Sequence, residues 1–546
     1  MAGLVTAFGS GAMTNSINEI SDSKMMFVIG ANPSEAHPVI AAKMRQARRK
    51  GAGLIVADPR KTELAAMADV WLQLKPGSDV ALLNGLMHII LRDGLQDSDF
   101  IAHCTSGFDS VAATVANYPP DVVEQITGVS SCLLEQAAHL YAKAERAQIF
   151  YTLGITEHCW GTDNVLSIAN LAMLTGNVGK PCSGVNPLRG QNNVQGACDM
   201  GALPDVLPGY RKITDEDERK KFEQAWQISL PALRGFTIPE MFTAAVNGEV
   251  KAMYIVGENP VLSDANANHV SHALQSLDFL VVQDIFLTET ALLADVILPA
   301  ACFAEKNGTF TNTERRIQMV RKAVEPPGQS RTDLEIITDL AGRLGYPMHY
   351  AGPEDVMREI STLTRIYHGV TYERLQERGL QWPIPDITHP GTPFLHENGQ
   401  FTCGLGWFTS VEYHPPAEGP DAEYPLVLTT GRRLYHYNVS TFGKSAALSE
   451  QLPQERLWIH PADARQLGLS DEQCVNVESR RGSIQTKTWL TEAVPPGLVW
   501  LSFHFPDAPT NQITNDAGDQ ITRTYEYKVC AVRISVPPAA VNTSSC

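Results

Sequence analysis

The 546-residue chain is predicted to have an α/β fold, with two parallel-sheet domains related by an internal repeat and a small β-barrel at the end. Three observations predict this fold. Short β-branched runs alternate with helical stretches in the first two-thirds of the chain, one strand-and-turn motif occurs twice, and the residues after 424 contain mainly short strands. The composition, with 44% hydrophobic and 19% charged residues, is typical of a soluble globular protein.

The first predicted sheet begins with two apolar runs. Residues 25–30 and 53–57 are predicted to be buried strands, with a helix at 38–50 between them. The same alternation continues with a helix at 80–92, a strand at 149–154 and a helix at 164–174. A second set of strands is predicted at 252–257, 279–282 and 294–298.

A near-repeat links the two sets of strands. Residues 28–33 read VIGANP and residues 255–260 read IVGENP. In each copy a strand ends in glycine, Gly30 or Gly257, which lets a ligand approach the backbone. An Asn-Pro pair then turns the chain toward a helix, Asn32 and Pro33 in the first copy and Asn259 in the second. We therefore predict two Rossmann-like domains, residues 1–190 and 191–382.

The ends of the repeated strands are candidate nucleotide sites. Open α/β sheets bind ligands at the carboxyl ends of their strands. In each copy the next strand ends in an acid, Asp58 or Asp284, which can accept hydrogen bonds from a ribose or a guanine edge. Two ordinary strand-to-helix turns are the alternative, but the matched pair favours two nucleotide-bearing ligands.

The last third of the chain changes character. Residues 383–424 are rich in Pro and Gly and are predicted to be a linker. An all-β module, residues 425–538, follows and precedes a tail at 539–546. Its predicted strands are 426–428, 474–478, 483–488, 498–501 and 530–536. Its polar loops, 430–436 and 511–515, are candidates to clamp a ligand held by the α/β part.

The loop at residues 188–201, LRGQNNVQGACDMG, combines one arginine with several amides and glycines. No Asp or Glu occurs from residue 164 to residue 198, although acids make up 60 of the 546 residues. The planar guanidinium of Arg189 matches a carboxylate, so the loop predicts a site for a small anion beside a polar cofactor. Pairing of Arg189 with a distant carboxylate of the protein is the alternative.

Charge and cysteine content limit the possible partners. The net charge of −17 argues against nucleic acid and against an anionic membrane as partners. The ten cysteines contain no Cys-x-x-Cys pair, which fits a reducing compartment and argues against zinc or iron–sulfur ligation by the residues present. No apolar run approaches membrane-spanning length, so direct membrane insertion is not expected and a cytoplasmic location is predicted.

The loops at 189–205, 281–290, 305–316 and 430–437 together resemble the catalytic subunits of molybdenum-dependent, selenocysteine-type formate dehydrogenases, in the molybdopterin oxidoreductase family. The resemblance covers nearly the whole chain. It implies oxidation of formate to carbon dioxide, in anaerobic respiration, at molybdenum or tungsten held between two molybdopterin guanine dinucleotides. This cofactor agrees with the two repeated strand ends, and the resemblance also implies that the terminal barrel has six strands.

The resemblance assigns roles to individual residues. It implies that Arg189 orients formate by charge and that Gln191 lies beside the pterin. In the α/β part it implies cofactor contacts from Gly30, Asn32, Pro33, His37, Asp58, Arg60, Leu153, Glu157, Gly257, Asn259, Gln283, Asp284 and Asp333. In the barrel it implies contacts from Arg432, His436, Asn511 and Lys528.

The chain departs from this family at its start. Relatives begin with a domain whose four cysteines hold a 4Fe-4S cluster, followed by the selenocysteine or cysteine that ligates molybdenum and then a histidine. We expect these features upstream of Met1, so no metal ligand is predicted within the chain. The expected cause is a UGA selenocysteine codon read as a stop, with the gene prediction restarting beyond it.

Three functions remain open from the sequence. The first is a formate dehydrogenase that passes electrons to other subunits, a ferredoxin or a hydrogenase partner. The second is a related molybdopterin oxidoreductase, such as a nitrate reductase. The third is a remnant that binds cofactor without activity.

Overall fold

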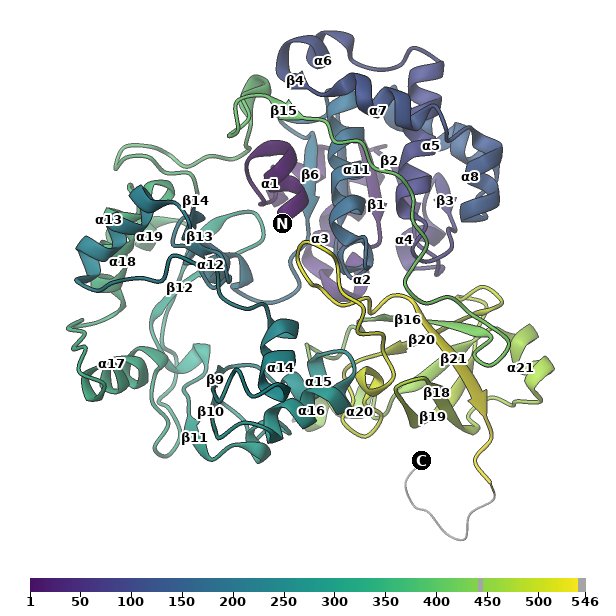
Figure 1. Cartoon of the computed structure of the whole chain (residues 1–546). Helices are drawn as coiled ribbons and strands as arrows, with labels where there is room; N and C mark the ends of the chain where they lie inside the picture. The colour runs from purple at the N-terminus through teal and green to yellow at the C-terminus, as the bar shows by residue number, and fades with distance from the viewer. Residues whose placement is uncertain (440–444, 539–546) are drawn as a thin grey trace. The chain divides into compact units, whose positions relative to one another are not determined.

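The computed structural model describes residues 1–439 and 445–538 (Figure 1). The chain divides into two compact units, and each is described by itself. Unit 1 comprises Met1–Leu188, Leu262–Asn268 and Phe394–Cys546, and unit 2 comprises Arg189–Val261 and His269–Pro393. The first α/β segment therefore shares a unit with the barrel. The domain boundaries predicted above stay a prediction.

A five-stranded parallel sheet forms the centre of unit 1, in the order β3-β2-β1-β5-β6. Its central strand is buried on both faces, because Phe27 and Ile29 join one apolar cluster while Met26 and Val28 join another. The strands are β1 (Met25–Ile29), β2 (Gly53–Ala57), β3 (Val70–Leu72), β5 (Ala147–Tyr151) and β6 (Gly184–Pro187).

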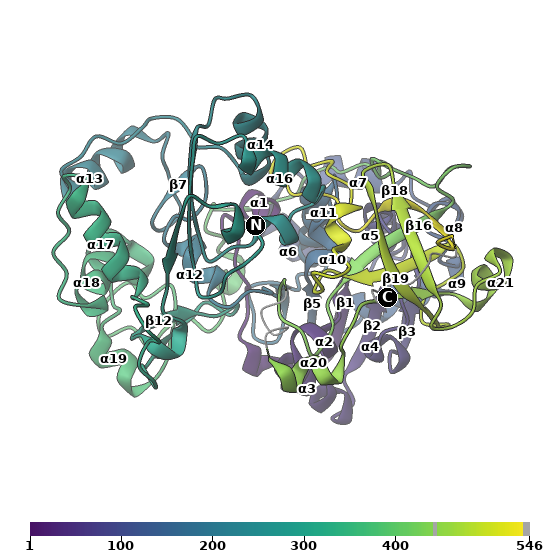
Figure 2. The same ribbon diagram turned by 90° about the horizontal axis from the view of Figure 1, so that it is seen from below.

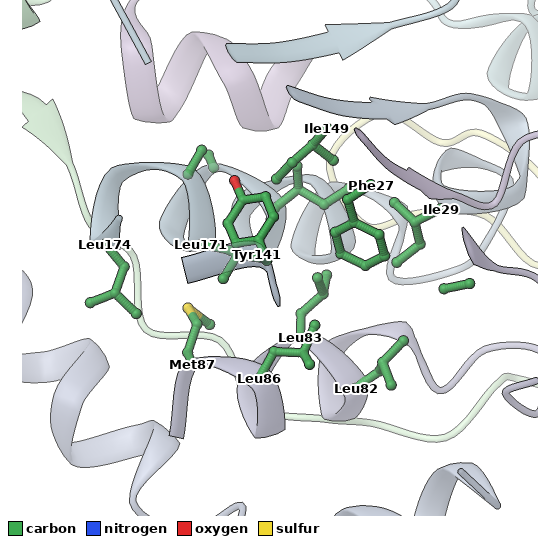
Figure 3. Close-up of a cluster of buried hydrophobic side chains, with 14 of the residues drawn as sticks. Phe27, Ile29, Leu82, Leu83, Leu86, Met87, Tyr141, Ile149, Leu171 and Leu174 are labelled. Carbon is green, nitrogen blue, oxygen red and sulfur yellow. The ribbon is translucent and has the colours of Figure 1, made fainter. Parts of the chain in front are cut away.

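Helices cover both faces of this sheet. Figure 3 shows one cluster, in which Phe27 and Ile149 of the sheet point toward Leu83 of α5, Tyr141 of α9 and Leu171 of α11. The helices of unit 1 are α1 (Ala2–Phe8), α2 (Pro33–Ala36), α3 (Pro38–Arg49), α4 (Glu63–Ala66), α5 (Asp79–Arg92), α6 (Ser98–Cys104), α7 (Phe108–Val115), α8 (Pro120–Thr127), α9 (Ser131–Ala142), α10 (Leu153–Thr156), α11 (Gly161–Leu174), α20 (Ala446–Gln451) and α21 (Pro461–Leu467).

The barrel of unit 1 is closed and has six strands, as predicted, in the order β16-β20-β17-β19-β18-β21. Figure 2 labels three of them, β16, β18 and β19. Alternate residues face its core, as in β18, where Val475 and Val477 are buried. The strands are β16 (Leu426–Gly431), β17 (Arg456–Ile459), β18 (Cys474–Ser479), β19 (Gly482–Leu490), β20 (Leu498–Ser502) and β21 (Cys530–Ser535).

Unit 2 contains a second parallel sheet, in the order β11-β10-β9, and an antiparallel sheet, β12-β13-β14. The strands of these sheets are β9 (Ala252–Val256), β10 (Phe279–Asp284), β11 (Val296–Pro299), β12 (Gly308–Thr311), β13 (Arg316–Val320) and β14 (Leu380–Gln381). The helices along this part of the chain are α12 (Val194–Asp199), α13 (Glu216–Trp226), α14 (Ile238–Val246), α15 (Pro260–Ser263), α16 (Ala267–Gln275), α17 (Asp333–Arg343), α18 (Pro353–Leu363) and α19 (Tyr372–Glu377).

The remaining short elements complete the fold. They are β4 (Thr105–Ser106) paired with β15 (Gly406–Trp407), β7 (Val206–Leu207) paired with β8 (Arg211–Lys212), and the 3-10 turns Ile17–Asp22, Ala291–Leu293, Phe303–Glu305, Arg365–Tyr367, Glu397–Gly399 and Thr510–Gln512. Within residues 1–439 and 445–538 we find no helix with the length and hydrophobicity that a membrane crossing requires.

The structure confirms the predicted repeat of strand, glycine and helix. Gly30 and Gly257 follow β1 and β9 with φ angles of 54° and 66°, which are left-handed conformations. Each glycine N–H donates to the neighbouring strand, Gly30 to Ala57 O at 3.0 Å and Gly257 to Gln283 O at 2.8 Å. The helices α2 and α15 then begin at the prolines of the two Asn-Pro pairs. The fold class, two parallel-sheet regions and a terminal barrel, is therefore confirmed.

Candidate functional site

A pocket opens in unit 1 at the carboxyl ends of β1, β2 and β5, and its empty volume, including the part open to solvent, is about 820 Å³. This location is the one that open α/β sheets use for ligands. The lining residues are Gly30, Ala31, Asn32, Ala36, His37, Ala57, Asp58, Pro59, Arg60, Leu74, Pro76, Gly77, Asp79, Thr152, Leu153, Gly154, His158, Thr429, Thr430, Gly431, Arg432, Phe503 and Lys528.

The repeated glycine shapes this pocket by backbone packing. Gly154 N donates to Gly30 O at 3.0 Å, and a Cβ on Gly30 would lie 2.6 Å from the carbonyl carbon of Gly154. At Gly257, in unit 2, a Cβ would meet no atom within 4 Å. We expected both glycines to give a ligand access to the backbone. At Gly30 the space beside the α-carbon is filled by Gly154, so the glycine permits the close approach of two chain segments.

Three buried or largely buried cations line the pocket. Lys528 Nζ forms an ion pair with Glu157 Oε2 at 2.6 Å and donates to Thr430 Oγ1 at 3.2 Å. The Arg60 guanidinium lies 4.7 Å from the centroid of the Trp500 ring. Burial lowers the pKa of Arg432, although the charge of Glu157 opposes that change. Lys528 is thus already paired with Glu157, and Arg60 Nε lies 3.9 Å from Asp58 Oδ1. The three cations together still give this wall of the pocket N–H donors that suit a phosphate.

A buried acid and a buried histidine form another part of the wall. Burial raises the pKa of Asp79 to about 6, and the nearby His158 opposes the rise. Burial acts to lower the pKa of His158, but the opposite effects of Glu526 and Asp79 together are larger, so the pKa of His158 is raised. His158 Nε2 lies 4.0 Å from Asp79 Oδ2, and its Nδ1 lies 3.7 Å from Glu526 Oε1. These groups form a buried cluster of two carboxylates and one imidazole, which was not predicted from the sequence.

Two of the predicted polar residues in the pocket, Asp58 and Asn32, differ in their hydrogen bonds to the protein. Asp58 Oδ1 accepts a hydrogen bond from Arg60 N at 2.8 Å, and burial raises the Asp58 pKa against the lowering effect of Arg60. Asn32 Oδ1 is buried and accepts no hydrogen bond from any residue that the structure describes. A buried acceptor of this kind is suited to a donor group on a ligand.

The structure brings together eight of the predicted cofactor residues. Those lining the pocket are Gly30, Asn32, His37, Asp58, Arg60, Leu153, Arg432 and Lys528. Glu157 reaches the pocket through Lys528.

Besides Glu157, three predicted cofactor residues of unit 1 are not among the residues that line the pocket. Pro33 begins helix α2. His436 Nε2 lies 3.0 Å from Leu452 O, and Asn511 Nδ2 donates to Leu262 O at 2.7 Å. The roles of these three residues in binding cofactor stay predictions.

The second predicted nucleotide site lies in unit 2 and is internally hydrogen-bonded. Asn259 Oδ1 accepts from Thr290 Oγ1 at 2.7 Å. Gln283 Nε2 donates to Asp333 Oδ1 at 2.7 Å, and Asp333 also forms an ion pair with Lys306. Around this strand end the polar side chains therefore form a network of their own.

Asp284 closes strand β10 beside that network. Its Oδ1 accepts from Ile285 N at 2.6 Å, and burial raises its pKa. The cofactor roles of Gly257, Asn259, Gln283, Asp284 and Asp333 stay predictions.

The arginine loop lies at the start of unit 2. Arg189 is half-buried, its backbone N–H donates to Thr313 Oγ1 at 3.1 Å, and its Nε donates to Gln195 Oε1 at 3.2 Å. Gln191 is exposed, whereas Gln195 is buried on helix α12. The sequence interpretation named Gln191 and missed Gln195, the amide that contacts the arginine side chain.

Comparison with known proteins identifies the family. Residues 4–343 match the model described as "Molybdopterin oxidoreductase", and residues 426–531 match the "Molydopterin dinucleotide binding domain".

Curated relatives match along nearly the whole chain. The F420-dependent formate dehydrogenase subunit alpha of Methanocaldococcus jannaschii is 48% identical over 98% of this chain and 80% of its own length. Formate dehydrogenase H of Escherichia coli is 43% identical over 98% of this chain and 76% of its own length. The assimilatory nitrate reductase catalytic subunit of Bacillus subtilis is 36% identical over 96% of this chain and 76% of its own length.

A solved structure agrees with the fold. Acetylene hydratase from Pelobacter acetylenicus superposes with a TM-score of 0.75 at 20% identity, covering 98% of this chain and 80% of that chain. At this identity the likeness concerns the fold alone. From the family model and the curated relatives, the chain belongs to the molybdopterin oxidoreductase family.

Proposed function

We propose that this chain forms the cofactor-binding and substrate-binding part of a formate dehydrogenase, which oxidises formate to carbon dioxide at a molybdenum or tungsten bis-molybdopterin guanine dinucleotide centre. The observation that carries the proposal is the cation-lined pocket at the ends of β1, β2 and β5. The relatives named formate dehydrogenase, at 48% and 43% identity, support formate as the substrate.

The pocket fits one phosphate-bearing nucleotide tail of this cofactor. Arg60, Arg432 and Lys528 supply positive charge for a diphosphate, and the buried Asn32 Oδ1 supplies an acceptor. Asp58 is placed where a carboxylate can accept hydrogen bonds from a ribose or a guanine. In unit 2 the matching turn after β9 is proposed to hold the second tail.

The protein residues bind and orient the reactants. Arg189 is proposed to pair with the formate carboxylate through its planar fork and so to fix the direction of the C–H bond. Gln191 is proposed to lie beside the pterin. When bound, the metal centre supplies the acceptor for the two electrons of formate.

Two alternatives are less well supported. The nitrate reductase named above is 36% identical to this chain, which is lower than the identity of the two formate dehydrogenases. A remnant that binds cofactor without activity would retain pterin in the full-length protein and show no formate-dependent dye reduction.

Several finer features belong to the proposal. A 4Fe-4S cluster and a selenocysteine or cysteine ligand outside these 546 residues stay predictions. The transfer of electrons to other subunits, a ferredoxin or a hydrogenase partner, and the cytoplasmic location, also stay predictions.

Substitution of Arg189 tests the function. In the full-length holoenzyme, Arg189→Lys is expected to raise the KM for formate by at least about 10-fold, because an ammonium cannot form the paired N–H contacts of a guanidinium. The measurement is formate-dependent reduction of a viologen dye, with the pterin content of each preparation determined in parallel. An unchanged KM would remove Arg189 from substrate binding.

A matched substitution separates this effect from a general loss of charge. Arg211, in the same unit, forms an ion pair with Glu218 at 3.4 Å. Arg211→Lys is expected to leave the KM for formate unchanged. Turnover of nitrate in place of formate by the unmodified enzyme would support the nitrate reductase alternative.

A further inference from the structure

A buried carboxylate lies behind the arginine loop. Asp199 ends helix α12 and is fully buried. Its Oδ1 accepts from Gln195 Nε2 at 2.8 Å and from the Tyr210 hydroxyl at 2.7 Å. Its Oδ2 accepts from the Tyr367 hydroxyl and from Trp382 Nε1, each at 2.7 Å. Each carboxylate oxygen thus receives two hydrogen bonds, an arrangement that suits the ionised acid, which has only acceptor sites.

This carboxylate determines which way the Gln195 amide points. Gln195 and Asp199 are four residues apart, so they share one face of α12. The Gln195 NH2 group donates to Asp199 Oδ1 and also lies 2.9 Å from the Tyr210 hydroxyl oxygen. With the nitrogen held there, the amide oxygen faces Arg189 Nε at 3.2 Å. A reversed amide would place N–H donors against the N–H of the guanidinium, which is unfavourable.

The backbone around this network is held in unusual conformations. Asn193, which precedes α12, has a φ of 57°, and its Oδ1 accepts from Thr311 N at 2.8 Å. Tyr210 has a φ of 62°. Left-handed conformations are unfavourable for non-glycine residues and cluster at functional sites. Two such residues flank the Gln195 and Asp199 pair in sequence.

We propose that Asp199 is a positioning residue for anion recognition by Arg189 and acts through the amide of Gln195. This inference rests on the proposed role of Arg189 in binding formate. The hydrogen bond that Arg189 Nε donates to Gln195 Oε1 uses one of the five N–H donors of the guanidinium and fixes its plane. Because Gln195 is neutral, it orients the guanidinium without neutralising its charge. A guanidinium held in one plane loses less rotational freedom when it forms paired contacts with a carboxylate.

The substitution Asp199→Asn tests the inference in the full-length holoenzyme. The asparagine has the same shape. Because Trp382 Nε1 can only donate, the asparagine oxygen should stay on the Trp382 side and its NH2 group should face Gln195, so the Gln195 amide loses its fixed direction. We expect the KM for formate to rise by about 10-fold while kcat changes by less than about 3-fold, with pterin content unchanged. An Asp199→Asn variant that folds, retains pterin and has an unchanged KM would overturn the inference.

A second readout does not depend on turnover. Phenylglyoxal modifies arginine side chains, and bound formate should protect Arg189 from it. Modification of Arg189 is followed by mass spectrometry of its peptide. We expect the formate concentration that gives half-protection to be higher in Asp199→Asn than in the wild type, by the same factor as the KM.

Two tyrosines provide a matched pair of variants. This pair also tests the inference if Asp199→Asn does not fold. Tyr210 and Tyr367 each donate one 2.7 Å hydrogen bond to Asp199, but only the Tyr210 bond goes to the oxygen that holds Gln195. We expect Tyr210→Phe to raise the KM for formate several-fold and Tyr367→Phe to lower only the Tm. Equal KM changes in the two variants would indicate a purely structural role and overturn the inference.

Failure of the proposed function gives a different result. If Arg189→Lys leaves the KM for formate unchanged, Arg189 does not bind formate and the proposal for Asp199 falls with it. If Arg189→Lys raises the KM while Asp199→Asn and Tyr210→Phe do not, only the role of Asp199 is overturned.

Discussion

Asp79 is an acid in the first turn of α5 that forms part of the pocket wall in unit 1. Its position at a helix N-terminus favours the charged form, yet burial dominates and raises its pKa from 3.8 to about 6. The folded protein therefore binds a proton more tightly at this residue than the unfolded chain does. Between pH 4 and pH 6 this residue makes stability fall as the pH rises.

Asp79→Asn is expected to remove this pH dependence. Above pH 6 the wild-type protein carries a buried negative charge at residue 79 that costs about 3 kcal/mol, because burial raises the pKa of Asp79 from 3.8 to about 6. The variant should therefore gain Tm relative to wild type as the pH is raised from 5 to 7.5. The measurement is the Tm difference between the two cofactor-free proteins across that pH range.

An exposed acid serves as the control for Asp79. Asp99 lies in the first turn of α6 and is exposed, so Asp99→Asn should change the Tm only a little. A Tm difference for Asp79→Asn that stays constant from pH 5 to 7.5 would contradict the assignment of a raised pKa.

At the scale of single residues, the sequence predicted those pocket residues whose charge or position in the chain is informative by itself. Arg60 and Lys528 carry permanent charge, and Asp58 follows a strand directly, so each could be named from its position. The importance of Asp79 and His158 could not be predicted from neighbouring residues in the sequence. Their environment arises only when the fold brings α5, the turn after α10 and Glu526 together. Gln195 was missed because several amides of the same loop are equivalent until helix α12 places one against Arg189.

At the scale of elements, the long apolar runs were predicted well and the short elements were not. Strand β2 has the predicted bounds, and helix α5 differs from its prediction by one residue. Strands β3, β6 and β17 were missed because they have three or four residues, and β6 contains Gly, Asn and Pro, which strands avoid. The predicted strand at 149–154 was wrong at its end, since β5 stops at Tyr151 and α10 begins at Leu153.

The repeated turn gives a prediction at the element scale. Gly30→Ala and Gly257→Ala place the same residue at matched turns with φ angles of 54° and 66°. The left-handed backbone should cost each variant about 1 to 2 kcal/mol. Gly30→Ala adds a clash with the Gly154 backbone, whereas Gly257→Ala meets no atom within 4 Å. Gly30→Ala should therefore lower the Tm more and also reduce the pterin content of the purified protein.

Wild type and the two alanine variants should be compared by thermal unfolding of cofactor-free protein, so that pterin content does not affect the Tm. Equal Tm losses in the two variants would show that the contact between Gly30 and Gly154 adds nothing to the cost of the turn itself.

At the scale of the whole molecule, the chain is strongly acidic, whereas its pocket gathers three cations beside Asp58 and Asp79. The chain has a net charge of −17, yet the pocket contains Arg60, Arg432 and Lys528. The prediction that nucleic acid is not a partner follows from the net charge of the chain. It does not bear on the cations in the pocket. A buried cation is screened by salt much less than a surface charge, whereas the long-range repulsion of an anion by the whole protein is screened strongly.

This difference predicts an unusual salt dependence of anion binding. Guanosine diphosphate, which carries the guanine and diphosphate groups of the proposed cofactor, should bind cofactor-free protein with an affinity that stays level or rises from about 0.05 to about 0.5 M NaCl. Lys528→Met should raise the Kd at least about 10-fold at every salt concentration, because one charge-assisted hydrogen bond is lost and Glu157 loses its ion-pair partner. Calorimetric titration gives both quantities. An affinity that falls steeply with salt in the wild-type protein would place the bound diphosphate on exposed surface cations instead of in the pocket.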